Sequence, residues 1–392
     1  MARSTGSGGG RGEGRSGGGK RKKKIIRKDG QGGFDYLEIS SFIGHYFSKG
    51  IKPGAIPALL NSAHNITIHP KSIWRWLTEI ASKKGFTYNA NEALNLRIQI
   101  KALYPFLLNV DVVATAMLET VAMSGAQFVF QLLREMVAGG KYNHGIHIGV
   151  AGGRILRSVM QSLSQEFIKA FTGDGAGLLS DVPTKLTLHA LGAGFNIDDP
   201  TTDPNAMFTR FLFDPAIPVE TKFVALHAPP IVHSDELEGL KKLDGICEAY
   251  ERRNELDIVL TGLGTWKDTT GLLRCYMEKD PQSIKQLNDE FVLGDLCWRP
   301  VGENGPIETP TRIRAMTLLE LHELAGLIER GGKVALFCGP GVGGLTKTEV
   351  LEVILANNQH LINYLIIDSR TARELVALPP RVRRQPGVVS GK

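Results

Sequence analysis

The stretch IHIGVAGGRILRSVM, residues 146–160, combines a short apolar segment, a glycine-rich turn and the start of a helix. The β-branched side chains of Ile146, Ile148 and Val150 favour a buried strand. Glycine removes the Cβ atom where a chain must turn sharply or let a ligand approach. A helix opening at about Arg154 would place its free N–H groups and its positive dipole end over this turn. The pattern predicts either a cradle for a phosphate or other anion, or a tight turn without a ligand.

The glycines of this stretch are Gly149, Gly152 and Gly153, spaced as G-x-x-G-G. This spacing matches neither the G-x-G-x-x-G of dinucleotide-binding turns nor the G-x-x-x-x-G-K-[ST] loop of nucleotide hydrolases. The segment GPGVGGLTKT, residues 339–348, also fails as such a loop, because Thr346 stands where the motif requires its second glycine. The motifs therefore argue against a nucleotide hydrolase.

Strand and helix patterns alternate after this turn to near the end of the chain. Strands are expected at 185–191, 223–230, 256–264, 333–339 and 362–368, helices at 206–212, 237–253, 317–330 and 348–357, and a hairpin at 294–301. Such alternation is typical of an α/β domain with a mostly parallel sheet covered by helices on both faces. Ligands bind at the carboxyl ends of the strands in these sheets. Glycine turns at 149–153, 262–264 and 339–344 all fall at such ends, so we expect a pocket there.

Residues 34–88 have a different pattern, that of three short helices. Pro53 opens the second helix, and the third, KSIWRWLTEIASKKG, is expected to stop at Gly85. The second and third helices would form a helix-turn-helix, in which the start of the last helix faces the major groove of DNA. The residues at that position are Lys71, Ser72, Arg75 and Trp76. The alternative is a small helical bundle with an ordinary solvated face. Residues 89–141 are expected to be largely helical.

The net charge of +6 is concentrated at the two ends of the chain. Residues 1–28 carry ten Lys or Arg against the single Glu13, a net +9, and residues 381–392 add +4, which leaves −7 for the part between them. Residues 1–33 have little to bury, so we expect a disordered basic tail there and another at 379–392. These tails can contact nucleic acid without sequence discrimination, or remain solvated.

Composition excludes several classes of protein. At 392 residues and 42% hydrophobic, the chain is long enough for two domains, and no apolar run reaches the roughly 18 residues that a membrane span needs. We therefore expect a cytoplasmic protein. The cysteines lack metal-ligand spacing and are interpreted as reduced, and scattered histidines are interpreted as core or surface residues, so that neither a metal nor a cofactor is predicted. These residues are Cys247, Cys275, Cys297, Cys338, His144, His147, His189, His227 and His233.

No nucleophile with its base is recognisable in the sequence. Asp295 and Asp368 follow or end predicted strands and could meet at the pocket rim, where a carboxylate accepts hydrogen bonds from sugar hydroxyls. Asp198 and Asp199 lie in a loop where a turn role is equally reasonable. Lys347 stands at a predicted helix start beside a glycine turn and would suit a phosphate. Nothing in these residues requires an enzyme.

Six segments of the chain, taken in order, resemble the SorC family of sugar-binding transcriptional regulators, which is related to the DeoR-type regulators. The resemblance runs from about Phe34 to Leu378. Its segments are IGVAGGR, FVALHAPPIVHSDEL, LDIVLTGLGTW, VLGDLCWRPVGENG, GGKVALFCGPGVGGLTK and LINYLIIDSRTARELVAL.

The resemblance implies a helix-turn-helix DNA-binding domain at 34–88 and an effector domain at 89–378. The effector domain would have the Rossmann-like fold shared by sugar-phosphate isomerases and CoA transferases. Its ligand would be a sugar or sugar phosphate, and the protein would bind a partly palindromic operator in double-stranded DNA as a homodimer or homotetramer. Alternatives are a sugar-phosphate isomerase or deaminase on the same fold, and a sugar-binding protein without specific DNA binding.

The resemblance also carries over particular residues. Those expected at the ligand are Gly149, Gly152, Gly153, Arg154, Gly262, Gly264, Asp295 and Lys347. Two positions of the effector domain depart from the family pattern: Ile155 stands where a Thr or Ser hydroxyl is usual, and Ser369 replaces an acidic residue. The segment AHNITIH also lengthens the expected turn of the helix-turn-helix.

Overall fold

The computed structural model describes residues 36–48, 51–81, 83–115, 117–140, 142, 145–172, 181–194, 199–217 and 219–379. The basic tail at 1–33, the C-terminal tail from Pro380, Asp198 and His144 lie outside these residues.

The described residues form a mixed α/β structure with a largely parallel sheet, which confirms the predicted fold class. The strands are β1 (Asn109–Val113), β2 (Ile146–Val150), β3 (Lys185–Ala190), β4 (Glu220–Val224), β5 (Ile231–His233), β6 (Ile258–Thr265), β7 (Val292–Leu296), β8 (Arg299–Gly302), β9 (Gly305–Pro306), β10 (Ile313–Ala315), β11 (Lys333–Cys338) and β12 (Tyr364–Asp368). The α-helices are α1 (Tyr36–Ser48), α2 (Ile56–His64), α3 (Ile73–Ala81), α4 (Lys83–Leu103), α5 (Leu118–Ala138), α6 (Arg154–Thr172), α7 (Pro204–Met207), α8 (Thr209–Phe213), α9 (Leu237–Leu240), α10 (Cys247–Glu251), α11 (Leu272–Met277), α12 (Pro281–Asp289), α13 (Leu321–Glu329), α14 (Thr348–Ala356) and α15 (Ser369–Ala377). Short 3-10 helices are η1 (Pro70–Ser72), η3 (Pro200–Thr202), η4 (Arg252–Glu255) and η5 (Val342–Gly344).

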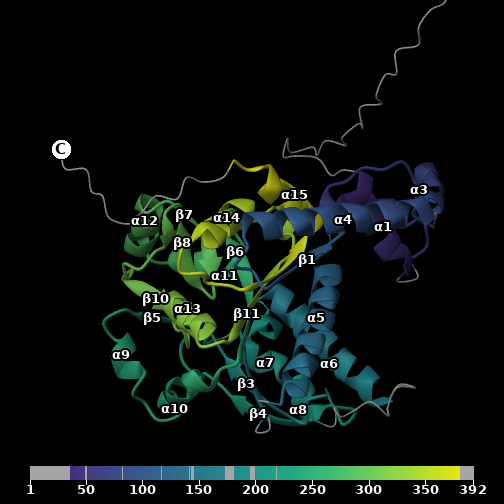
Figure 1. Ribbon diagram of the computed structural model, residues 1–392. Coiled ribbons are helices and arrows are strands. Elements are labelled where there is room, and N and C mark those ends of the chain that lie inside the picture. Colours follow the sequence, from purple (N-terminus) through teal and green to yellow (C-terminus); the bar gives the residue numbers. More distant parts are fainter. Residues whose placement is uncertain are drawn as a thin grey trace, which may run out of the picture.

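The central sheet has the strand order β1-β12-β11-β6-β2-β3-β4, and every neighbouring pair in this order is parallel. The hairpin of β7 and β8 extends it from β6 in antiparallel fashion. Figure 1 shows α5 and α6 together on one side of the sheet, with α4, α14 and α15 on the other side. No helix among the residues placed here is long and apolar enough to span a membrane.

The strand order reverses between β2 and β6. From β2 the chain moves outward through β3 to β4, and from β6 it moves the other way through β11 to β12. The loops after β2 and β6 therefore leave the sheet in opposite directions and open a crevice at the carboxyl ends of the strands. This crevice is where the sequence analysis expects a pocket.

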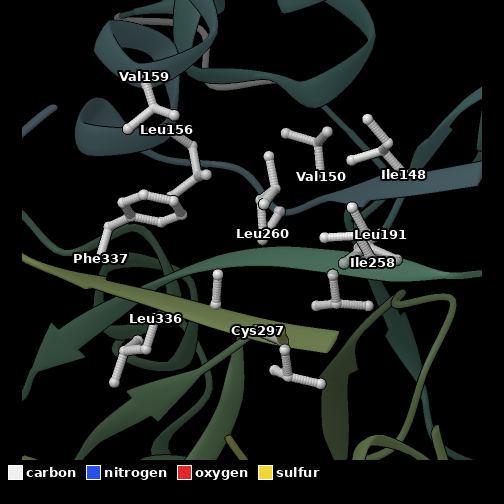
Figure 2. Packing of buried hydrophobic residues seen from close by; sticks show 14 of the residues in the cluster. Ile148, Val150, Leu156, Val159, Leu191, Ile258, Leu260, Cys297, Leu336 and Phe337 are labelled. Carbon is white, nitrogen blue, oxygen red and sulfur yellow. The ribbon is translucent and has the colours of Figure 1, made fainter. Parts of the chain in front are cut away.

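Residues from both faces of the sheet fill the main core, as the side chains around β2, β6 and β11 in Figure 2 illustrate. Phe337 of β11 is fully buried beneath α5. A Cβ atom on Gly125 of α5 would lie 2.5 Å from the ring, so the missing side chain lets this helix approach Phe337 closely. Leu156 of α6 lies near the same ring in Figure 2.

The N-terminal helices form a smaller core of their own. Its buried residues are Ile39, Phe42, Ile43, Ile56, Leu60, Ile66, Ile68, Ile73, Trp76, Leu77 and Met117. Asn65 ends α2 with a left-handed backbone (φ 53°), and Ile66 and Ile68 of the following turn are buried. The segment that lengthens this turn therefore contributes side chains to the small core.

One predicted helix end is wrong. The third helix was expected to stop at Gly85, but α3 ends at Ala81 and α4 continues past Gly85, because glycine in a helix interior costs only about 1 kcal/mol. The expected domain boundary between residues 88 and 89 therefore falls inside α4. Residues 89–141 are largely helical, as expected, because α4 and α5 cover most of them, but they also contain β1, which was not predicted and which pairs with β12.

The helix expected at 237–253 is also interrupted. It consists of α9, α10 and η4, and the break lies at Gly245, which has a φ of +81°. Glycine adopts this left-handed conformation readily, and a continuous α-helix does not contain it.

We expect the substitution Phe337→Ala to lower the free energy of unfolding by about 3–5 kcal/mol, because it leaves a cavity beneath α5. Phe213→Ala is the matched control, since Phe213 is 77% exposed, and it should change stability by less than about 0.5 kcal/mol. Urea unfolding followed by circular dichroism measures both. Equal effects for the two variants would contradict the described packing of β11.

Candidate functional site

A cavity of about 700 Å³ lies at the carboxyl ends of the central strands. Residues 151–155 after β2, residues 261–265 of β6 and residues 268–273 after it line the cavity. Pro340, Gly341 and Lys347, which follow β11, line it as well. The hairpin of β7 and β8 contributes Asp295, Cys297 and Trp298. The cavity thus occupies the crevice where the strand order reverses.

Seven of the eight residues expected at a ligand line this cavity: Gly152, Gly153, Arg154, Gly262, Gly264, Asp295 and Lys347. Gly149 does not, and its predicted role is corrected. It lies inside β2, where a Cβ atom would be 2.7 Å from Cδ2 of Leu191. Gly149 therefore makes room for a core leucine.

The glycine turn after β2 is shaped by its neighbours. Gly153 has a φ of +122°, and its N–H donates to the carbonyl oxygen of Thr202 at 2.9 Å, so this amide does not face a ligand. A Cβ atom on Gly152 would lie 2.9 Å from Cζ2 of Trp298. Within the described parts of the chain, the backbone N–H groups of Arg154 and Ile155 have no acceptor. The start of α6 is therefore available to an anion.

Ile155 replaces the usual hydroxyl-bearing residue at the start of α6. Its side chain is 5% exposed. Cβ atoms on Gly262 and Gly339 would each lie 3.0 Å from it. Both glycines therefore accommodate Ile155, and an anion at this end of the sheet would depend on backbone N–H groups and on nearby cationic side chains.

Asp295 is held in the cavity by its pairing partner. Gly264 of β6 lies directly opposite Asp295 of β7, and a Cβ atom on Gly264 would overlap with the Asp295 carboxyl group. Burial raises the pKa of Asp295 to about 6, and the positive charge of Lys347 opposes this rise. Near neutral pH this carboxyl group can exist in either form, so it can donate to or accept from a sugar hydroxyl.

Lys347 stands immediately before α14, after a turn in which Gly343 and Gly344 have φ values of +64° and +73°. No carboxylate of the described residues lies within ion-pair distance of its ammonium group. Its charge nevertheless acts on Asp295: burial raises the pKa of that carboxyl group, and the charge of Lys347 makes the rise smaller. Lys347 is thus a cation at the cavity that remains available to an anionic ligand.

Arg154 has a partner that the sequence analysis missed. Its Nη2 atom donates to Oδ2 of Asp268 at 2.8 Å, and the Asp268 side chain is only 8% exposed. Burial alone would raise the pKa of Asp268, but hydrogen bonds from Thr270 and the Arg154 guanidinium hold it below its usual value. The residues KDTTG, 267–271, have the Asp and Gly that are typical of a turn. This turn at the end of β6 was the sequence signal that could have placed Asp268 at the cavity.

Trp298 is a second residue that the sequence analysis missed. It shares the turn between β7 and β8 with Cys297, and both have positive φ values, 59° and 52°. The hairpin at 294–301 was predicted, but Asn and Gly are the usual residues in such a two-residue turn, so a role for Trp298 at the cavity was not. A Cβ atom on Gly192 would be 3.2 Å from the indole ring. The strained backbone holds a flat aromatic side chain at the cavity.

Asp368 does not lie at the cavity, and the predicted meeting with Asp295 is wrong. Its carboxylate accepts hydrogen bonds from the N–H groups of Arg370 and Thr371 and from the Thr371 hydroxyl, at 3.0, 2.9 and 2.7 Å. It is the N-cap of α15. Asp199, in contrast, lines the cavity and pairs with Arg157 at 2.9 Å.

The residues expected at DNA are only partly at the surface. Lys71 and Arg75 are exposed, and Ser72 is half-buried in η1. Trp76 is 8% exposed and packs in the small core, so its predicted DNA contact is corrected. The exposed indole on α3 is that of Trp74, at 64%.

Comparison with solved structures identifies the fold. The full-length sorbitol operon regulator SorC of Klebsiella pneumoniae is 19% identical and matches with a TM-score of 0.54, over 87% of this chain and 99% of that one. A probable sor operon regulator of Shigella flexneri (17%, TM-score 0.53) and a DeoR family transcriptional regulator of Listeria monocytogenes (18%, TM-score 0.52) cover 73% and 72% of this chain, and 99% of their own chains.

No protein-family model and no curated protein sequence matches the chain. The structural likeness nevertheless confirms the resemblance inferred from the six segments at the level of the fold. The chain has the fold of SorC and DeoR-type regulators.

We expect Asp295→Asn to stabilise the protein at neutral pH. The pKa of Asp295 is raised from 3.8 to about 6, so the wild type loses stability as pH rises through 6, whereas an amide does not ionise. At about pH 7.5 the variant should be more stable by about 1–3 kcal/mol, and the difference should shrink towards about pH 4. Urea unfolding at both pH values measures this. A pH-independent difference would show that Asp295 titrates at its ordinary pKa.

Proposed function

We propose that the protein is a transcriptional regulator that binds operator DNA through its N-terminal helices and is controlled by a sugar or sugar phosphate in the cavity. The observation that carries the proposal is the convergence of seven expected ligand residues on one cavity, in the fold of SorC and DeoR-type regulators. The proteins with this fold that are described above are called operon or transcriptional regulators.

The cavity suits a ligand with both an anionic group and hydroxyl groups. The free N–H groups at the start of α6 and the Lys347 ammonium would hold a phosphate. Asp295 would hydrogen bond to hydroxyl groups, and the apolar face of a sugar ring would pack on the Trp298 indole. Arg154, fixed by Asp268, supplies a further guanidinium group at the rim.

The described structure offers a direct route from the cavity to the DNA-binding unit. Helix α2 lies against η5, the turn between β11 and Lys347. Met117 belongs to the small N-terminal core, and its neighbour Leu118 lines the cavity. We call residues 339–347, between β11 and α14, the Lys347 loop. A ligand that orders this loop would thus favour one position of the N-terminal helices and change operator affinity.

Operator binding would use a homodimer or homotetramer, since helix-turn-helix proteins read paired half-sites through two recognition helices. Exposed apolar side chains of Leu94 and Ile98 on α4, one helical turn apart, offer a contact surface for a second copy. Light scattering that gives a monomer mass both with and without operator DNA would contradict this assembly.

An isomerase or deaminase on the same fold is the less favoured reading. No histidine of the described residues lines the cavity. Turnover of sugar phosphates by the purified protein would support the enzyme and contradict the regulator.

We expect Lys347→Ala to abolish thermal stabilisation by the cognate phosphosugar. A ligand at 100 times its dissociation constant adds about 2.7 kcal/mol to the stability of the protein. Thermal unfolding of the full chain against a panel of sugars and sugar phosphates identifies the ligand first. Lys267→Ala is the control, because Lys267 is an exposed lysine paired with Glu349 outside the cavity, and it should retain the shift. If both variants lose the thermal shift equally, the shift depends on the net charge of the protein and not on Lys347 in the cavity.

We expect the double substitution Lys71→Ala/Arg75→Ala to weaken sequence-specific DNA binding at least tenfold, because each side chain faces the groove in the proposed complex. A duplex selected from a random pool by the wild type serves as probe in fluorescence anisotropy. Lys185→Ala/Lys222→Ala removes the same charge from exposed positions on β3 and β4 and should bind normally. Unchanged affinity in the first variant would refute recognition by α3.

A further inference from the structure

Three side chains with metal-ligand chemistry meet outside the cavity. They are His147 of β2, His189 of β3 and Glu255, the last residue of η4. His147 and Glu255 lie near the amino ends of β2 and β6, whereas the cavity lies beyond the carboxyl ends of these strands. The group is therefore separate from the proposed sugar site.

Strand pairing brings the two histidines together. In the parallel pair of β2 and β3, Gly149 lies opposite His189 and His147 lies opposite Thr187. Side chains two residues apart share a face of the sheet, so His147 and His189 are diagonal neighbours on one face. Their ring atoms Nδ1 of His147 and Nε2 of His189 are 2.9 Å apart.

Glu255 completes the group from a different segment. Its Oε2 atom lies 3.2 Å from Nδ1 of His147, and one ligand atom from each of the three residues falls within 4.8 Å of the others. Tetrahedral zinc has bonds of about 2.0–2.1 Å to nitrogen and oxygen, which separates its ligand atoms by roughly 3.3 Å. Small side-chain movements therefore suffice to place a cation between them.

One proton can lie between these three atoms. A proton on Nδ1 of His147 can face both the Glu255 carboxylate and the lone pair on Nε2 of His189. Two electron-pair donors thus already converge on one hydrogen position, and a divalent cation can take that position. The displaced proton would move to Nε2 of His147, a residue whose side chain is 19% exposed.

His189 is suited to be the anchoring ligand. It is fully buried, which disfavours the charged form of its ring, and its Nε2 atom is directed at Nδ1 of His147. A neutral imidazole offers one lone pair to a metal. Burial near the carboxyl end of β3 also fixes the ring, which reduces the ordering that a cation must impose.

The backbone at His147 is equally fixed. Its N–H donates to Oδ2 of Asp257 at 2.9 Å, and the N–H of Asp257 donates to the carbonyl oxygen of His147 at 3.0 Å. This reciprocal pair ties the start of β2 to the start of β6. The Asp257 carboxylate also adds negative charge beside the group, which favours a cation.

One neighbour opposes a cation. The Nη2 atom of Arg252 lies 2.8 Å from Oε2 of Glu255, and its Nε atom lies 3.1 Å from the same oxygen. Arg252 donates hydrogen bonds to the Glu255 carboxylate, and its positive charge repels a cation. Since Glu255 is 43% exposed, its carboxylate can turn away from Arg252.

We propose that His147, His189 and Glu255 bind one divalent transition-metal cation of the zinc class, with water completing its coordination. Two imidazole nitrogens and one carboxylate oxygen suit zinc and its neighbours better than magnesium or calcium, which prefer all-oxygen sites. The cation would join β2, β3 and η4 at the amino end of the sheet.

The test titrates the full-length, tag-free protein with Co²⁺, whose visible absorption reports tetrahedral coordination, and then displaces it with Zn²⁺. The wild type should bind one Co²⁺ per chain without thiolate charge-transfer bands. Glu255→Gln and His147→Gln should weaken binding at least tenfold. Glu251→Gln, an exposed carboxylate in the preceding helix, is the matched control and should bind like the wild type.

A fourth variant tests the opposing neighbour. Arg252→Gln frees the Glu255 carboxylate and removes a positive charge, so it should tighten Co²⁺ binding several-fold. Because this variant gains affinity, loss of folding cannot explain its result. Equal affinity in wild type, Glu255→Gln and His147→Gln, thiolate bands in the wild type, or no binding at millimolar Co²⁺ would overturn the proposal.

Discussion

The pairing of β2 with β6 is the constraint on which the rest of the α/β structure depends. Three residues of each strand pair in parallel, and the N–H of Ala151 then donates to the carbonyl oxygen of Leu260 at 2.9 Å. Beyond this bond the two segments diverge: the chain after β2 enters α6, whereas β6 continues to Thr265 and pairs with β7. The divergence both opens the cavity and brings Arg154 and Asp295 to its walls. The same pair carries His147 and Asp257 near its opposite end, so one strand pairing positions both proposed sites.

Glycines around the cavity serve packing as much as ligand access. Gly152 lies against Trp298, Gly262 against Ile155 and Gly264 against Asp295. In each case a side chain from another segment occupies the space that a Cβ atom would take. The glycine turns that the sequence analysis interpreted as an anion-binding site thus partly make room for the protein's own side chains. The surfaces available to a ligand include the N–H groups of α6, the indole ring, the Asp295 carboxyl group and Lys347.

The alternating fold was predictable because buried parallel strands are continuous apolar runs and the turns between them are rich in glycine. β1 was missed, since its five residues lie between two long helical patterns. Strand ends and family resemblance predicted seven residues that line the cavity, whereas Trp298 and Asp268 reach it through a hairpin turn and an ion pair. His147 and His189 are diagonal neighbours on adjacent strands. Their positions along the sequence do not predict this, because it depends on the register between β2 and β3.

In the proposed regulator, the Lys347 loop is the element through which a ligand would act. A ligand shifts a conformational equilibrium only if it binds the two states with different affinity. Lys347 would provide such a difference by binding the phosphate in one position of its loop and lying away from it in the other. η5 precedes it by a few residues and lies against α2. In this proposal, ordering of the loop would reach the N-terminal helices directly through the contact of η5 with α2, without any rearrangement of the central sheet.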